Sequence, residues 1–205
     1  MREDDIPTLK GLLVEGPSRP WERIGFAIVN GRFEVGGVTF ALTGREPGGI
    51  RAWHLDVKEP VDVEGLRHEP VAAAPPTSHP NGTVALDHVV VTTPDLERTT
   101  TALARLGLMP HRTVEGIPGR GDHRFRFFLL GTSVLELIGP ATPGGDRPAR
   151  FAGIAFATGR LDELDGELGP LLGDVHDAIQ PGRRIASVKD EAGLGVPVAF
   201  MTPRS

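Results

Sequence analysis

The fold is decided by the stretch ALDHVVVTTPDLERTTTALARLGL, residues 85–108. Its first part is apolar and rich in β-branched residues, which predicts a strand over residues 84–91. Its second part carries leucines at helical spacing, which predicts an amphipathic helix capped by Thr93 with Pro94 in its first position. His88 does not fit this strand, because burying its polar ring without a partner would cost roughly a few kcal/mol.

The same order of elements recurs further along the chain. After the first helix we expect two strands, and then a second unit of strand, helix and strands, over residues 123–130, 132–138, 151–157, 161–168, 185–189 and 196–201. The first unit ends with SVLELIGP and the second ends with VPVAFMTP. This order of elements is therefore an internal repeat.

A fainter third copy lies upstream of these two units. ERIGF (22–26) is similar to ARLGL (104–108), and GGVTFALTG (36–44) is similar to GTSVLELIG (131–139). This copy predicts a short helix and two strands, over residues 20–26, 33–43 and 50–57. The proline-rich segment that follows, over residues 58–83, contains AAAPPTSHPNG and is the best linker candidate.

Composition excludes several kinds of protein. The net charge of −5 gives no basic surface for nucleic acid. The absence of cysteine excludes disulfides, thiolate metal ligands and a cysteine nucleophile. The N-terminus is too acidic for a signal peptide, and no apolar run approaches the roughly 18 residues that span a membrane. We therefore expect a cytoplasmic protein with neither nucleic acid nor membrane as a partner.

The motifs LDHVVV, PDLERTTTALARLGL and VLELIGP resemble a module of the vicinal oxygen chelate superfamily. Glyoxalases, bleomycin-resistance proteins and extradiol dioxygenases belong to this superfamily. The resemblance implies an α+β fold in which tandem βαβββ modules form an open, cup-shaped mixed sheet. It implies a glyoxalase-like domain of two paired modules over residues 83–205. Residues 1–82 would form a degenerate extra module and a linker, packed on the same sheets or at an interface.

The resemblance also implies a divalent metal ion in the cup, such as zinc, iron, manganese or nickel. Family ligands lie on the first and last strands of each module. We refer to these places as the ligand positions. In this chain they are His88 and Glu136 in the first paired module, Gly153 and Ala199 in the second, and Gly11 and Ala41 in the N-terminal copy. One half of a metal site is thus present, and a third ligand would have to come from His54, His111, His123, His176 or a homodimer partner.

Three functions follow from these residues. The first is a metal-dependent lyase, isomerase or dioxygenase, in which His88 and Glu136 hold the ion. Glu136 with His88 could also perform acid–base catalysis without a metal. The second is a metal-free protein that binds or sequesters a small molecule, and the third is a structural or regulatory module.

Several further side chains are candidates for ligand binding in the cup, namely His88, Arg124, Arg126, Phe127 and Arg183. Arg124 and Arg126 share one face of their strand, and Phe127 lies on the other face, so the register decides which of them line the cup. Arg183, which follows a Pro-Gly turn, would either bind an anion or form a structural ion pair. The glycine-rich loop over residues 116–124 would lie at the mouth of the cup as a lid.

Overall fold

The computed structural model describes residues 6–45, 48–115 and 122–204, which form two mixed β-sheets and three α-helices. The predicted lid falls mostly outside these residues. The smaller sheet has four strands in the order β2-β3-β1-β4, and the larger has eight in the order β10-β11-β12-β9-β5-β8-β7-β6. Neither sheet closes into a barrel, which confirms the predicted α+β class and open sheet. None of the described helices is long and apolar enough to cross a membrane.

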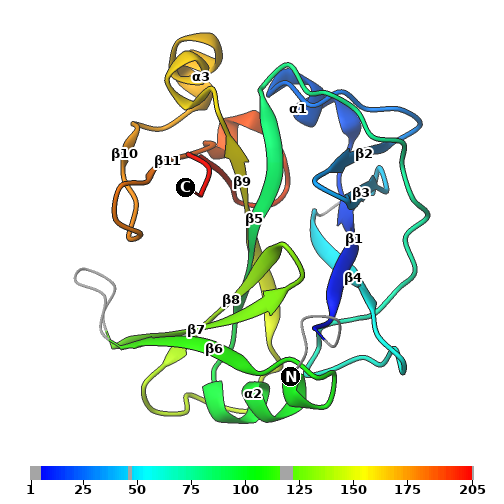
Figure 1. Cartoon of the computed structure of the whole chain (residues 1–205), viewed down its shortest axis with the longest axis vertical. Helices are drawn as coiled ribbons and strands as arrows, with labels where there is room; N and C mark the ends of the chain where they lie inside the picture. The colour runs from blue at the N-terminus through cyan, green and yellow to red at the C-terminus, as the bar shows by residue number, and fades with distance from the viewer. Residues whose placement is uncertain (1–5, 46–47, 116–121, 205) are drawn as a thin grey trace.

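The larger sheet consists of two βαβββ modules. The first contains β5 (Thr83–Thr92), α2 (Leu96–Ala104), β6 (Pro110–Glu115), β7 (His123–Leu130) and β8 (Ser133–Pro140). The second contains β9 (Arg150–Thr158), α3 (Leu161–Leu168), β10 (His176–Asp177), β11 (Arg184–Ser187) and β12 (Val198–Met201), with two short 3₁₀ turns at Gly169–Leu171 and Asp190–Ala192. Strands β5 and β9 pair antiparallel at the centre, and each module's last strand pairs parallel to its first. The outer strands of both modules curve toward the same side of β5 and β9 (Figure 1).

The smaller sheet repeats the centre of the larger one. Its strands are β1 (Thr8–Glu15), β2 (Arg32–Val35), β3 (Val38–Leu42) and β4 (Gly49–Asp56), and helix α1 (Ser18–Arg23) follows β1. Strand β3 is parallel to β1, as β8 is to β5, and β4 is antiparallel to β1, as β9 is to β5. The single strand predicted over residues 33–43 is therefore wrong. Gly36 and Gly37, both at positive φ, form a two-residue turn that divides this segment into a hairpin.

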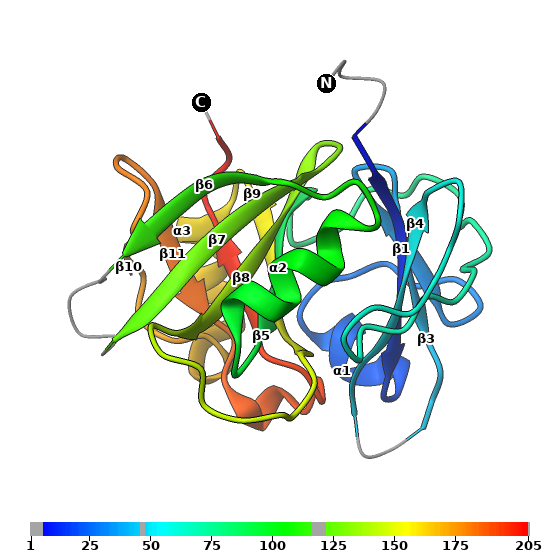
Figure 2. The ribbon, with the colours of Figure 1, turned by 90° about the horizontal axis from the view of Figure 1, so that it is seen from below.

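The two sheets share one hydrophobic core. The ring centroids of Phe40 and Phe156 lie 5.2 Å apart, and those of Phe26 and Phe200 lie 6.1 Å apart. Trp21 is fully buried and meets Phe156 edge to face at 6.4 Å. The smaller sheet thus lies on the face of β5 and β9 opposite the side toward which the outer strands curve (Figures 1 and 2).

In the first module, the predicted start of α2 is wrong and one strand was not predicted. The N-cap of α2 is Asp95, whose side chain accepts a hydrogen bond from the Arg98 N–H at 3.0 Å, and not Thr93. The Thr93 hydroxyl instead accepts from the Asp95 N–H, so Pro94 lies outside the helix. Strand β6 was not predicted, because this edge strand is almost wholly exposed and lacks the apolar alternation of a half-buried strand.

Candidate small-molecule site

The strand register places the ligand positions of all three modules in equivalent places. Glu136 on β8 pairs with Val90, which lies two residues after His88 on β5. The same offset relates the other two pairs of ligand positions, because Ala199 pairs with Ala155, two residues after Gly153, and Ala41 pairs with Leu13, two residues after Gly11. Side chains two residues apart share a face of a strand, so His88 and Glu136 lie on the same face of the sheet.

A break in the register of β5 directs two consecutive side chains to this face. Leu86 pairs with Phe156 on β9, whereas His88 pairs with Ala155, so Asp87 is an extra residue in β5. Such bulges often occur next to functional sites, where they redirect a side chain. The Ser133 hydroxyl donates a hydrogen bond of 3.0 Å to the Leu86 carbonyl beside the bulge. As a result, Asp87 and His88 both line the same cavity.

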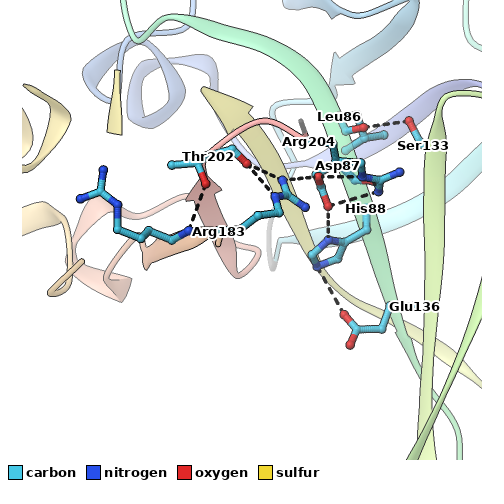
Figure 3. Close-up of polar contacts among 9 residues, drawn as sticks. Leu86, Asp87, His88, Ser133, Glu136, Arg183, Thr202 and Arg204 are labelled. Carbon is cyan, nitrogen blue, oxygen red and sulfur yellow. Dashed lines mark hydrogen bonds and ion pairs between the residues drawn. The ribbon is translucent and has the colours of Figure 1, made fainter. Parts of the chain in front are cut away.

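The imidazole of His88 lies between two carboxylates (Figure 3). Its Nδ1 is 2.9 Å from Oδ1 of Asp87, and its Nε2 is 3.3 Å from Oε2 of Glu136. The side chain of His88 is 13% exposed and that of Glu136 is 12% exposed. The polar residue in the middle of the apolar strand therefore has a carboxylate beside each ring nitrogen.

Asp87 is held by two arginines from the second module. Its Oδ2 lies 2.6 Å from Nη2 of Arg183 and 3.3 Å from Nε of Arg204. Arg183 also donates to the Thr202 carbonyl, and Arg204 donates to the Asp87 carbonyl at 3.1 Å. Burial raises the pKa of the Asp87 carboxyl, but the hydrogen bonds from His88 and Arg183 and the charge of Arg204 together hold this pKa well below its ordinary value. Asp87 is therefore an ionised, buried anchor for three cationic or polar groups.

The cavity beside His88 has a volume of about 260 Å³ and lies between the two modules. Its lining combines apolar and charged side chains, among them Phe127, Leu129, Arg112, Arg183 and Arg204. Four hollows in the described part of the chain are larger, at about 280, 290, 460 and 630 Å³, but none of their charged residues is buried. We therefore regard the cavity at His88, where buried charges meet an apolar wall, as the candidate site.

The structure brings three of the predicted ligand-binding residues, His88, Phe127 and Arg183, to this cavity. Glu136 contacts His88 but is not part of the cavity lining. The two arginines of β7 lie elsewhere. Arg126 donates hydrogen bonds to α2, including one of 2.7 Å to the Thr100 hydroxyl, and Arg124 lies 3.6 Å from Glu115. The side of β7 that faces the cavity is therefore that of Phe127.

Sequence reasoning missed Asp87, Arg112 and Arg204, which also line the cavity. A signal for Asp87 was present in LDHVVV, where a second polar residue precedes His88. Arg204 lies three residues beyond the end of β12, and no sequence pattern links it to Asp87. Of the histidines considered as a third metal ligand, His111 lines the cavity, whereas His54 accepts a hydrogen bond from the Val71 N–H.

The donor set does not fit the metal ion that the family resemblance implies. A catalytic ion normally has about three protein ligands, and only His88 and Glu136 among the six ligand positions carry a donor side chain. Asp87, the nearest further carboxylate, is engaged by Arg183 and Arg204. Within the described part of the chain, no group of three or more His, Asp or Glu side chains has the arrangement of a metal site.

Comparisons with known proteins give similarity of structure but not of sequence. Neither a protein-family model nor a curated protein matches the chain. A mutant of 4-hydroxymandelate synthase from Streptomyces coelicolor is 13% identical over 97% of this chain and 94% of that chain, with a TM-score of 0.64. A xylose isomerase-like TIM barrel/4-hydroxyphenylpyruvate dioxygenase fusion protein is 10% identical over 97% of this chain and 49% of that chain, with a TM-score of 0.63.

A methylmalonyl-CoA epimerase from Mycobacterium tuberculosis also matches, at 16% identity over 62% of this chain and 92% of that chain, with a TM-score of 0.49. Identities this low say nothing about which reaction, if any, the chain performs. What the two matches of higher TM-score share with this chain is the arrangement of the sheets. The chain therefore has the fold of these two structures, in agreement with the fold that its resemblance to the vicinal oxygen chelate superfamily implies.

Proposed function

We propose that this chain is a metal-independent small-molecule binding protein whose ligand occupies the cavity beside His88. The observation that carries the proposal is the donor set, in which only His88 and Glu136 among the six ligand positions carry a donor side chain. A catalytic ion normally has about three protein ligands, and the further carboxylate beside His88, that of Asp87, is engaged by Arg183 and Arg204. The glycines and alanines at the other ligand positions support the same conclusion, because they supply no side-chain donor.

The charged side of the cavity is suited to binding because it is already organised. Asp87 fixes Arg183 and Arg204 on one side and the His88 ring on the other. Rotamers that are fixed before binding lose little conformational entropy when a ligand arrives, so a larger share of the contact energy appears as affinity. A ligand would thus meet a polar wall of fixed geometry opposite the apolar wall formed by Phe127 and Leu129.

The contact between His88 and Glu136 favours a second candidate, proton transfer to or from the bound molecule. His88 lines the cavity, and the Glu136 carboxylate lies behind it at Nε2. A histidine held by a carboxylate is a common general base or acid. In this variant the ligand takes the place of Glu136 at Nε2 of His88 and exchanges the proton there, while Asp87 at Nδ1 orients the ring and balances its charge.

The binding proposal can be tested by ligand-induced thermal stabilisation in the presence of a metal chelator. A small-molecule library is screened against the wild type, Leu129→Trp, which fills the cavity, and Val84→Trp, a control on the same sheet at a residue that is 60% exposed. A ligand at about 100 times its Kd stabilises by about 2.7 kcal/mol. We expect hits to stabilise the wild type and Val84→Trp but not Leu129→Trp.

Two results would contradict the proposal. One is stabilisation that disappears with the chelator and returns with added metal, because the ligand would then bind through an ion. The other is stabilisation that persists in Leu129→Trp, because the ligand would then bind elsewhere. Turnover of a hit by the wild type, lost in His88→Gln, would identify the proton-transfer variant.

A further inference from the structure

We infer that the ligand is a small carboxylate with a flat apolar body, such as an aromatic carboxylic acid. This inference rests on the proposed binding function and names the class of ligand. It follows from the charges that surround the cavity, from the guanidinium groups that remain free to bind, and from the shape of the apolar wall.

The cavity is a cationic site on an acidic protein. Its lining includes three guanidinium groups, of Arg112, Arg183 and Arg204, and one carboxylate, of Asp87. With neutral histidines this gives a local charge of 3 − 1 = +2, whereas the whole chain carries −5. Adding the nearby Glu136 still leaves an excess of one positive charge. Such a cavity attracts anions and disfavours cations.

Two of the three arginines have hydrogen-bonding capacity to spare. Arg183 is buried and is used by Asp87 and by the Thr202 carbonyl. Arg204, whose side chain is 48% exposed, contacts Asp87 through Nε and Nη2. Arg112 lies over the ring of Phe127, with its guanidinium carbon 6.0 Å from the centroid, and its side chain makes no hydrogen bond to another described residue. A guanidinium has five N–H donors in a planar fork that matches a carboxylate.

The remaining lining is apolar and partly planar, which indicates the body of the ligand. Phe127 and Leu129 lie on β7 and Val134 on β8, and Val114 on β6 and Ile179 after β10 complete the wall. Ile179 is 49% exposed, so a ligand that covers it would remove apolar surface from water. The volume of about 260 Å³ lies below the range of drug-sized pockets and suits a molecule of one ring.

The test is isothermal titration of the full-length protein with matched probes. Benzoate, benzamide, benzylamine and phenyl phosphate share one ring and differ in the charge and geometry of the head group. We expect benzoate to bind about tenfold or more tightly than benzamide, because a charge-assisted hydrogen bond is lost with the amide. Benzylamine should bind more weakly still. The affinity for benzoate should fall as the salt concentration rises.

Three variants locate the contact. Arg112→Gln should weaken benzoate binding about tenfold and leave benzamide binding nearly unchanged. Leu129→Trp should abolish binding of every probe. Arg124→Gln is the matched control, because this arginine lies on the neighbouring strand β7 but pairs with Glu115 outside the cavity. It should bind benzoate like the wild type.

The outcomes separate the two proposals. Equal affinity for benzoate and benzamide, sensitive to Leu129→Trp, would overturn the ligand class and leave the binding function standing. Phenyl phosphate binding more tightly than benzoate would replace the carboxylate by a phosphate ester. Equal weakening by Arg112→Gln and Arg124→Gln would exclude the assigned contact. Failure of every probe and of the wider library to bind would contradict the binding function itself.

Discussion

The strand pairs β5–β8 and β9–β12 have the same register, but they present different side chains to the cavity side of the sheet. The first pair carries His88 and Glu136, and the second carries Gly153 and Ala199 in the equivalent places. The second module contributes charge from other segments, because Arg183 precedes β11 and Arg204 follows β12. Where the family resemblance leads one to expect a second pair of metal ligands, this module supplies cations that bind Asp87. The comparison shows that two strand pairs with the same register can differ in chemistry, because different side chains occupy their equivalent positions.

The largest effect is expected from removing residues 1–80, because this deletion removes the whole smaller sheet and α1. Phe156 on β9 packs against Trp21 of α1 and Phe40 of β3, so the second strand pair shares its core with the N-terminal residues. We expect the fragment 81–205 to lose cooperative unfolding or to precipitate, as thermal unfolding followed by circular dichroism would show. A soluble fragment that unfolds cooperatively at the wild-type temperature would show instead that the glyoxalase-like domain predicted over residues 83–205 stands alone.

Replacing Asp87 should produce the next largest effect. Asp87→Ala leaves the buried guanidinium of Arg183 without its charged partner, and the loss of one member of a buried pair typically costs about 3–5 kcal/mol. We expect a decrease of about 3 kcal/mol in the free energy of unfolding measured with urea. The matched control in the second module is Ala199→Ser, which should change this free energy by about 0.5 kcal/mol or less. Similar effects of the two substitutions would contradict the asymmetry between the modules.

The pH dependence of the free energy of unfolding should also show the contribution of the ionised Asp87 carboxylate, with a smaller effect. The pKa of Asp87 is lower in the folded chain than in the unfolded chain, so its ionised form stabilises the fold. This contribution is fully present above the unfolded pKa of about 4 and is lost as the pH falls below it. Between about pH 4 and pH 2 we expect the wild type to lose more stability than Asp87→Asn, measured by urea unfolding at each pH. Parallel curves for the two proteins would mean that Asp87 is not held as described.

The smallest effect is expected for Glu136→Gln. The amide keeps an oxygen at Nε2 of His88 and removes only the charge, so the free energy of unfolding should fall by about 1 kcal/mol. Nitrogen NMR of the His88 ring should show a changed environment at Nε2 and an unchanged hydrogen bond at Nδ1 to Asp87. A change at Nδ1 of equal size would mean that the two carboxylates do not act on separate ring nitrogens.

The sequence predicted those parts of the fold that carry a strong apolar pattern. Strands such as β5, β8 and β9 alternate or are wholly apolar, and α2 has a clear apolar face. Strand β6 has neither, because it lies at the edge of the sheet and is exposed on both faces. The hairpin in the smaller sheet was not predicted, because strand-forming residues lie on both sides of its two turn glycines and the segment resembles a single strand.

The candidate site could be predicted only in part for a similar reason. Strand period shows which residues share a face, but it does not show which face points to the cavity, so Arg126 and Phe127 could not be ranked. The bulge at Asp87 arises from the pairing of β5 with β9, which a single segment does not encode. The contact of Arg204 with Asp87 joins residues 117 positions apart and depends on the packing of the two modules.

The most direct test of the central claim is the metal content of the purified protein. Wild type, His88→Ala and Glu136→Ala are each incubated with zinc, manganese, nickel or ferrous iron, passed through a desalting column and subjected to elemental analysis. Because only two of the six ligand positions carry a donor side chain and Asp87 is engaged by arginines, we predict metal well below one equivalent in all three proteins, with no difference between them. Near-stoichiometric metal in the wild type that is lost in both variants would contradict the account and make the chain a metal-dependent enzyme candidate.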